Sequence, residues 1–484
     1  MPAPVCAVPL SHPPVPEEAF RLLAHEEGTF FLDSALPMPG LARYSILGCR
    51  PFRVMQSTGR RILLRDATGE RRIEEDPFRE MRRLLAEHKF PPHPEAPFIG
   101  GAVGYLGYDL CHFIEHLPRR TVADIPLPEL YLAFHDAAIV YDLQEQRAWA
   151  VGCAAGGRNA AQAAGELAER LTESLPPSPK RGQASFHNGE KQPDPFSPPF
   201  SSPDPFSSRV AGEMRCNFSR AEYLRAVARC IEYIGAGDIF QVNLSRRFEA
   251  PCALPPWQLY LRLRRINPAP MAAYLDLGEG RAVVSASPER FLSLRGRRVE
   301  TRPIKGTRPR GASAQEDRAL AEELLRSEKD NAELAMIVDL ERNDLGRVCS
   351  YGTVRVEEAR RLESYPTVHH LVATVSGALH AGRDRVDLLR ATFPGGSITG
   401  APKVRAMQII DELEPTARSV YTGAVGFLGF DGAMDLNIAI RTILAAQGGV
   451  WLQAGGGIVA DSEPEAEFDE TTQKARALLA ALGV

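Results

Sequence analysis

The chain has 484 residues, of which 44% are hydrophobic and 24% are charged, and its formal net charge is −4. These values are typical of a soluble globular protein, and the slightly acidic balance without a basic run argues against nucleic acid as a partner. No run of 18 apolar residues occurs, which excludes a membrane-spanning helix.

The cysteines and the first residues indicate the compartment. Eight cysteines are scattered without a Cys-x-x-Cys pair or a Cys/His cluster, so neither a zinc site nor a disulfide framework is predicted. We expect reduced thiols in a cytoplasmic protein. The first nine residues lack a basic segment and are interrupted by prolines, so no signal peptide is expected.

Residues 1–175 alternate short apolar runs with turn signals. Strand patterns occupy residues 30–34, 43–48 and 61–65, and an amphipathic helix pattern occupies residues 76–88. A glycine-rich segment at 101–109 recurs almost unchanged at 423–431. Its glycines are expected where a strand bends or packs closely against other backbone.

A segment rich in proline and serine follows. Residues 176–208 contain nine prolines and seven serines, a composition that cannot form a packed core. We therefore predict a linker or disordered insertion at 176–212, between an N-terminal region (1–175) and a catalytic domain (213–484).

The predicted catalytic domain mixes strands with helices. A helix is expected at 219–235, where Ser219 and Glu222 form a capping box, and strands are expected at 237–248, 272–277 and 282–287. Further helices are predicted at 314–327, at 330–345, from the glycine-rich turn 393–403 to about 413, and at 465–482, with Pro402 in the first turn of the third. The antiparallel-looking succession of strands indicates an α+β fold with flanking helices.

Residues 300–311, Glu-Thr-Arg-Pro-Ile-Lys-Gly-Thr-Arg-Pro-Arg-Gly, place Lys305 among three arginines. A lysine amine becomes nucleophilic when burial or neighbouring cations lower its pKa. Arg302, Arg308 and Arg310, together with burial, are the candidate causes here. On these residues alone an arginine-rich surface loop with an inert lysine is the simpler interpretation, and the reactive lysine is favoured only by motifs elsewhere in the chain.

Two helices carry paired carboxylates. Asp330 and Glu333 share one face of a predicted helix, and Glu467, Glu470 and Lys474 share one face of the last. Such oxygen ligands suit Mg²⁺, although two solvated helix faces would show the same spacing.

Several other polar groups are candidates for binding a small anion. The glycines at 455–457 and the turn at 395–397 offer backbone N–H groups, and Arg441 ends an apolar strand where it could bind a carboxylate. Tight turns or a structural ion pair are the alternatives. Glu289 could donate a proton to a leaving hydroxyl, or it could be an ordinary turn carboxylate.

Together these motifs resemble the chorismate-utilising enzyme family. The resemblance is dense over residues 215–484 and thinner over 17–150. It rests on Asp-Ile-Phe-Gln-Val-Asn-Leu-Ser at 238, Ser-Pro-Glu-Arg-Phe at 287, Thr-Arg-Pro-Ile-Lys-Gly-Thr at 301, Val-Asp-Leu-Glu-Arg-Asn-Asp-Leu-Gly at 338, Gly-Ala-Pro-Lys at 400 and Asp-Glu-Thr at 469. Within the family, Lys305 together with Gln241 resembles the aminodeoxychorismate synthase branch. Anthranilate synthases carry alanine at the first position, and isochorismate and salicylate synthases carry lysine at the second.

The resemblance implies an antiparallel fold with flanking helices and assigns roles by residue. Lys305 attacks chorismate, Glu289 protonates the leaving hydroxyl, and Mg²⁺ is held by Glu333 and Glu470 with Asp330 and Glu467 beside them. The substrate-binding residues implied are His370, Ser397, Tyr421, Arg441, Gly455, Gly456, Gly457 and Lys474.

The resemblance also implies partners and a second pocket. Ammonia is expected from a separate glutaminase subunit or from solution, because no nucleophile-elbow cysteine occurs in the chain. A tryptophan pocket is implied at Ser34, Arg43, Tyr44, Ser45, Ile46, Pro270, Met271 and Ala272. An anthranilate synthase component, or a non-catalytic paralogue that binds chorismate or tryptophan, remains the alternative; a retired site would have no reason to keep Lys305, Glu289 and all four acidic residues together.

Overall fold

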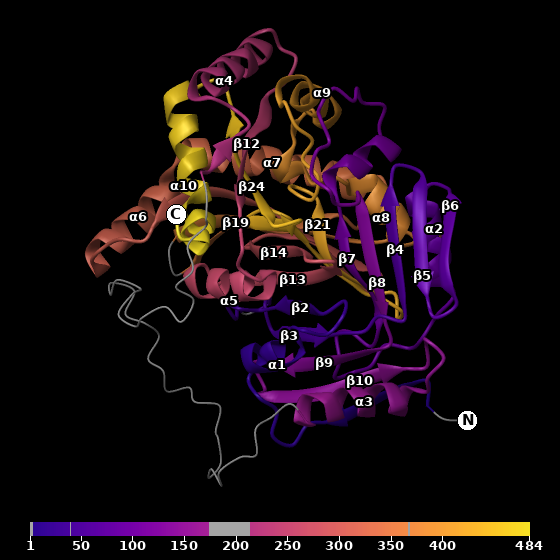
Figure 1. Ribbon diagram of the computed structural model, residues 1–484. Helices are drawn as coiled ribbons and strands as arrows, with labels where there is room; N and C mark the ends of the chain where they lie inside the picture. Colours follow the sequence, from indigo (N-terminus) through magenta and orange to yellow (C-terminus); the bar gives the residue numbers. More distant parts are fainter. Residues whose placement is uncertain (1–2, 39, 174–212, 366–367) are drawn as a thin grey trace.

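The computed structural model describes residues 3–38, 40–173, 213–365 and 368–484, so the predicted linker at 176–212 lies outside the described residues. The fold is built on two large antiparallel sheets with flanking helices, which confirms the predicted α+β class (Figure 1). None of the helices in the described ranges is long and apolar enough to cross a membrane.

Each sheet has twelve strands. The first runs in the order β1 (Val5–Pro9), β10 (Arg147–Cys153), β9 (Ala137–Asp142), β3 (Tyr44–Gly48), β2 (Phe30–Asp33), β13 (Met271–Gly278), β14 (Arg281–Ser287), β23 (Thr442–Ala446), β24 (Gly449–Ile458), β12 (Gln241–Pro251) and β11 (Arg215–Cys216), with β20 (Gly400–Ala401) also paired to β12. The second runs in the order β17 (Ile304–Pro309), β19 (Val368–Ala378), β16 (Arg298–Arg302), β15 (Arg290–Arg295), β22 (Met434–Ile438), β21 (Ala424–Gly429), β7 (Gly101–Leu106), β8 (Leu130–His135), β4 (Arg53–Thr58), β5 (Arg61–Asp66) and β6 (Gly69–Glu74), with β18 (Arg355–Ser364) also paired to β19.

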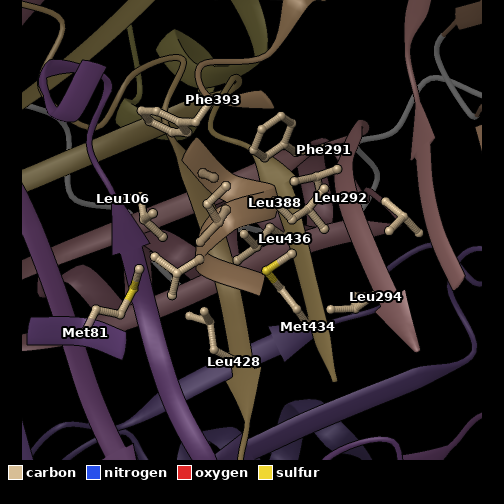
Figure 2. Close-up of a cluster of buried hydrophobic side chains, with 14 of the residues drawn as sticks. Met81, Leu106, Phe291, Leu292, Leu294, Leu388, Phe393, Leu428, Met434 and Leu436 are labelled. Carbon is tan, nitrogen blue, oxygen red and sulfur yellow. The ribbon is translucent and has the colours of Figure 1, made fainter. Parts of the chain in front are cut away.

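Side chains alternate between the two faces of each strand, so the buried residues form separate layers on either side of each sheet. Phe30 and Ile46 of the first sheet share a buried cluster with Val103 and Tyr131 of the second, so the two sheets pack face to face. The next residue on each strand points outward, because successive side chains alternate between faces. Helices cover both outer faces, and Figure 2 shows the cluster beneath the second sheet.

The helices follow their local signals. They are α1 (Pro16–Leu23), α2 (Pro77–Ala86), α3 (Ala160–Glu173), α4 (Arg220–Gly235), α5 (Pro256–Ile266), α6 (Ala314–Arg326), α7 (Glu328–Gly346), α8 (Arg385–Thr392), α9 (Lys403–Leu413) and α10 (Pro464–Leu482). The predicted capping box is present, with Ser219 and Glu222 bonding each other's backbone N–H groups. Two details differ from the prediction: Pro402 is the N-cap of α9 instead of a residue of its first turn, and the strand expected from 237 begins at Gln241.

The regions on either side of the predicted linker share both sheets. β2 of the N-terminal region pairs with β13 in the first sheet, and β7 pairs with β21 in the second. Strands that exchange backbone hydrogen bonds across both seams form one folded body. The structure therefore does not divide residues 3–173 and 213–484 into two separately packed domains, as the change in composition had suggested.

The repeated glycine-rich segments meet at one of these seams. β7 and β21 lie side by side with Gly104 opposite Gly426 (Figure 1). A Cβ atom on Gly104 would lie 1.9 Å from the carbonyl oxygen of Tyr131, and one on Gly426 would lie 2.0 Å from that of Asp435. The close backbone approach expected from the sequence is thus present, and only glycine avoids the clash.

Gly104→Ala should lower the free energy of unfolding by about 2 kcal/mol or more, because overpacked buried sites cost about 1–3 kcal/mol. Gly165→Ala is the matched control, since Gly165 lies in α3 with open space around its Cα. It should be neutral or stabilise by up to about 1 kcal/mol, because alanine favours a helix over glycine. Urea unfolding of both variants would test this, and equal midpoints would contradict it.

Candidate active site

Lys305 lies where the two sheets meet. The residues expected as a possible surface loop are two strands instead, β16 and β17, and Lys305 is on β17 at the edge of the second sheet. Its amino group reaches across to the first sheet: a Cβ atom on Gly457 of β24 would lie 3.3 Å from Lys305 Nζ. Gln241 Nε2 of β12 would lie 2.0 Å from the same Cβ atom, so the lysine amine and the glutamine amide converge over a position that must be glycine.

The three neighbouring arginines do not act on this amine as predicted. Arg302 pairs with Glu363 at 2.5 Å, Arg308 pairs with Glu323 and Asp330, and Arg310 pairs with Asp317 at 2.7 Å. Each guanidinium is therefore neutralised by a carboxylate of its own.

Burial lowers the pKa of Lys305 instead. Among the charged groups, Glu333 opposes this shift most strongly, the like charge of Lys474 adds to it, and Glu289 and Glu470 oppose it. Proximity in sequence misidentified the cations, because the fold brings acids from other elements to these arginines: Glu363 from β18, Asp317 and Glu323 from α6, and Asp330 from α7.

Glu289 is a buried carboxyl group beside the lysine. Its side chain is 4% exposed, and its Oε1 atom accepts a hydrogen bond from Ser397 Oγ at 2.6 Å and one from the Ile304 N–H at 3.4 Å. Burial raises the pKa of Glu289 to about 7, although both hydrogen bonds and Lys305 act in the opposite direction. A carboxyl group that titrates near neutral pH suits a general acid.

The acidic residues of α7 and α10 face each other across the site. Burial raises the pKa of Glu333 and of Glu467. Burial acts on Glu470 too, but Lys474, at 2.5 Å, outweighs it and lowers the pKa of this carboxyl. A Cβ atom on Gly456 would lie 2.8 Å from Glu467 Oε2 and 3.6 Å from Glu470 Oε1, so this glycine leaves room for both carboxylates.

One carboxylate oxygen of this set, Glu467 Oε2, is available to act as a ligand to a cation. Glu467 Oε1 accepts a hydrogen bond from Ser462 Oγ at 2.7 Å, whereas its buried Oε2 has no hydrogen-bond partner among the described residues. Asp330 instead pairs with Arg308 at 3.1 Å. Within the described ranges no three acidic, histidine or cysteine side chains enclose a cation by themselves. That open arrangement suits Mg²⁺, which usually keeps waters and takes only one or two protein carboxylates plus oxygens of a bound substrate.

Arg441 presents a guanidinium without an acidic partner. No carboxylate of the described residues forms an ion pair with it, and its Nη1 atom donates to the carbonyl oxygen of Lys474. Burial lowers the pKa of Arg441, and Tyr421 lies near it. The structural ion pair considered from the sequence is thus absent there, which leaves the fork available for a carboxylate ligand.

The remaining predicted substrate residues lie around the same space. Lys474 Nζ donates to the carbonyl oxygen of Gly455 at 3.0 Å. His370 Nδ1 lies 3.0 Å from Thr307 Oγ1, and burial together with the charge of Arg441 lowers the pKa of His370 to about 3. His370 is therefore neutral at physiological pH.

Two buried polar residues add to the predicted set. Gln241 is fully buried, and neither its Nε2 nor its Oε1 has a hydrogen-bond partner among the described residues. Glu341 of α7 accepts a hydrogen bond from Thr301 at 2.7 Å, and burial raises its pKa to about 8, with Glu289 contributing. Glu341 follows Asp330 by eleven residues, three helical turns, so the spacing alone could have placed it on the same face.

A separate cavity of about 780 Å³ opens at the seam between β2 and β13. Seven of the eight residues predicted for tryptophan line it: Ser34, Arg43, Tyr44, Ile46, Pro270, Met271 and Ala272. Ser45 does not, because strand alternation turns its hydroxyl inward to Asp33 Oδ1 at 3.0 Å. Arg290 and Asp435 form part of the wall and make a two-pronged pair with both distances at 3.0 Å.

Replacing Lys474 by methionine should raise the pKa of Lys305. The like charge of Lys474 lowers that pKa, and the same change frees Glu470, which raises it. The midpoint can be followed by NMR after ¹³C reductive methylation, with the exposed Lys89 as the internal reference. A midpoint for Lys305 equal to that of Lys89 in the unmutated chain would contradict the assigned environment.

Known proteins are similar to this chain in sequence over nearly its whole length. A family model described as chorismate binding enzyme matches residues 48–480. The chain is 43% identical to anthranilate synthase component 1 of Thermus thermophilus, over 96% of this chain and 95% of that protein. It is 40% identical to aminodeoxychorismate synthase component 1 of Klebsiella aerogenes, over 96% of each.

Solved structures agree with these matches. Anthranilate synthase component I from Streptococcus pneumoniae superposes with a TM-score of 0.76 at 31% identity, covering 92% of this chain and 93% of that one. The menaquinone-specific isochorismate synthase of Escherichia coli, with a TM-score of 0.70 at 17% identity over 99% of this chain and 95% of that one, supports the fold alone. Since the family model spans most of the chain and relatives match nearly its whole length, this protein belongs to the chorismate-binding enzyme family.

Proposed function

We propose that this chain is component 1 of an aminodeoxychorismate synthase, which replaces the C4 hydroxyl of chorismate by an amino group to make 4-amino-4-deoxychorismate for 4-aminobenzoate and folate synthesis. The observation that carries the proposal is that Lys305 and the buried carboxyl of Glu289 share one site, since Ile304, the residue before Lys305, donates its N–H to Glu289, and burial lowers the pKa of Lys305 and raises that of Glu289. A nucleophile and a proton donor in one enclosed site are what a two-step substitution needs.

In the first step, Lys305 Nζ forms a bond to C2 of the ring. The two ring double bonds move from C1–C2 and C5–C6 to C6–C1 and C4–C5, and the C4–O bond breaks. Glu289 gives its proton to the leaving hydroxyl, which departs as water. In the second step, ammonia attacks C4, the double bonds return, and Lys305 leaves as a neutral amine. The proton released by the new ammonium group restores Glu289.

Binding is assigned to the groups around this pair. Arg441, which has no acidic partner in the described ranges, is suited to one carboxylate of chorismate, with Tyr421, His370, Ser397, Lys474 and the backbone of Gly455–Gly457 nearby. Glu333, Glu467 and Glu470, with Asp330 at the margin, would hold Mg²⁺. When bound, this cation would supply positive charge to orient and polarise a substrate carboxylate.

Anthranilate synthase component 1 is the alternative within the family, since relatives with that name are as similar as those named aminodeoxychorismate synthase. Lys305 favours the aminodeoxychorismate synthase reaction. The family resemblance implies alanine at this position in anthranilate synthases. The relatives' designation as component 1 supports a second, amidotransferase component that supplies ammonia. We place that role outside this chain because its sequence has no glutaminase motif.

Lys305→Ala should abolish the covalent intermediate and slow formation of the 4-amino product at least about a hundredfold, as loss of a nucleophile typically does. It also opens space beside C2, so ammonia should attack there and yield some 2-amino product. Chorismate, Mg²⁺ and ammonium chloride are the assay components, with product identity by mass spectrometry and Lys89→Ala as the control.

A quenched sample of the unmutated protein should carry added mass on the peptide that contains Lys305. If the alanine variant makes the 4-amino product at the unmutated rate, Lys305 is not the nucleophile. If the unmutated protein makes only the 2-amino product, the anthranilate reaction replaces this proposal.

We also propose that the 780 Å³ cavity binds an aromatic amino acid such as tryptophan, because its lining combines apolar side chains such as Met271 and Phe427 with the polar side chains of Ser34 and Asn437. L-tryptophan should then raise the melting temperature, since a ligand that binds only the folded state stabilises it by mass action. Met271→Trp fills the cavity and should remove this response, while D-tryptophan serves as the control ligand. An unchanged melting temperature at millimolar L-tryptophan would exclude the cavity as a tryptophan site.

A further inference from the structure

Arg246 of β12 is a buried cation with no acidic partner. Its side chain is 5% exposed, and no carboxylate of the described residues lies within ion-pair distance. Burial lowers the pKa of Arg246, which shows that its surroundings disfavour the charge. A buried charge that is not paired costs stability, so the hydrogen bonds and ring contacts of Arg246 must offset that cost.

Among the described residues its hydrogen bonds to oxygen atoms all go to one helix, α10, and the Cys216 thiol of β11 also lies beside it. Arg246 Nε donates to Thr471 Oγ1 at 2.7 Å, and Nη2 donates to the carbonyl oxygen of Phe468 at 3.1 Å and to Thr472 Oγ1. The guanidinium also lies 3.8 Å from the centre of the Phe468 ring, a cation–π contact. The side chain of one strand residue thus contacts three residues in the N-terminal half of α10, Phe468, Thr471 and Thr472.

These contacts of Arg246 fix the rotation of α10 about its own axis. Phe468, Thr471 and Thr472 form one stripe of the helix, and Glu467, Glu470 and Lys474 form the stripe about 100° away, because each residue turns an α-helix by about 100°. Figure 1 shows α10 lying beside β12 and β24. Holding the first stripe against β12 therefore turns the second toward Gly455 and Gly456 of β24.

The fully buried apolar residues of α10 lie away from this stripe, where the half-buried Phe468 packs on Tyr223 of α4 and Arg246 supplies polar contacts beside it. The buried apolar residues of α10, Ala475, Leu478, Ala481 and Leu482, all lie in its C-terminal half. The N-terminal half begins at Glu463 without a side-chain cap. The other polar contacts there are an exposed ion pair between Arg220 and Glu465 and contacts of the site residues themselves, from Ser462 to Glu467, from Lys474 to Gly455 and from Arg441 to the carbonyl oxygen of Lys474.

We propose that Arg246 is a positioning residue, which sets the rotation of α10 so that Glu467, Glu470 and Lys474 face the chorismate site. The role of those three side chains rests on the proposed function, whereas the anchoring of the helix does not. The residue acts only through α10 and touches no reacting atom.

Arg247 offers a matched control. It is the next residue on the same strand, it is equally buried at 4% exposure, and it faces the other way to form an ion pair with Asp124 at 2.7 and 2.5 Å. Arg246→Met and Arg247→Met both remove a buried guanidinium and keep an unbranched apolar chain. Both should lower the melting temperature, so that stability alone does not separate them.

Amide hydrogen exchange of peptides covering 464–474 is the deciding measurement. Arg246→Met should speed exchange there at least about tenfold over the unmutated protein, because a residue that opens locally exchanges in proportion to its opening. Arg247→Met should leave these peptides unchanged. Thr471→Val, which removes an acceptor from α10 and leaves β12 intact, should act like Arg246→Met and serves if that variant does not fold.

A Mg²⁺ titration of the melting temperature with chorismate present gives the second readout. Arg246→Met and Thr471→Val should raise the half-maximal Mg²⁺ concentration about tenfold, the usual effect of losing a group that orients metal ligands. Unchanged exchange in both variants, or equal changes in Arg247→Met, would overturn the proposal. If the unmutated protein shows no Mg²⁺ response, the metal assignment fails, while the exchange data still decide whether Arg246 anchors α10.

Discussion

The site depends on the absence of side chains at Gly456 and Gly457 of β24. Any Cβ atom at 457 would meet the Gln241 amide and the Lys305 amine, and one at 456 would meet the Glu467 carboxylate. The edge of the second sheet can therefore approach the first, and α10 can lie across β24, only because these positions are glycine. A lysine, a glutamine and carboxylates from separate elements converge on a short stretch of bare backbone.

Electrostatics then sets the state of each group. Burial disfavours both the charged amine of Lys305 and the charged carboxylate of Glu289, so it lowers the pKa of the first and raises that of the second. The two groups are thereby shifted toward the neutral forms that a nucleophile and a general acid require. The nearby arginines contribute to folding, because each is held by a carboxylate.

Glu289, the proposed general acid, and the second cavity share a wall. Glu289 faces Ser397 and Ile304, whereas Arg290, the next residue, lines the cavity and pairs with Asp435 of β22. Neighbouring residues at a strand start point to opposite sides, which places a site for chemistry and a separate binding space on two faces of the same backbone. The same strand β22 leads directly to Arg441.

Sequence alone determined the local elements and the types of residue available for chemistry. The capping box of α4, the strand that leads to Glu289, the carboxylate pairs on α7 and α10 and the close-packed glycines follow from short-range periodicity and backbone geometry. Tertiary structure alone decided that the two halves share their sheets, that Ser45 turns away from the cavity and that the arginines beside Lys305 pair with acids. It also decided which groups are buried near one another. Burial and ion pairing bring together residues that lie hundreds of positions apart, and no local pattern encodes these contacts. They set the pKa values of the site and the rotation of α10.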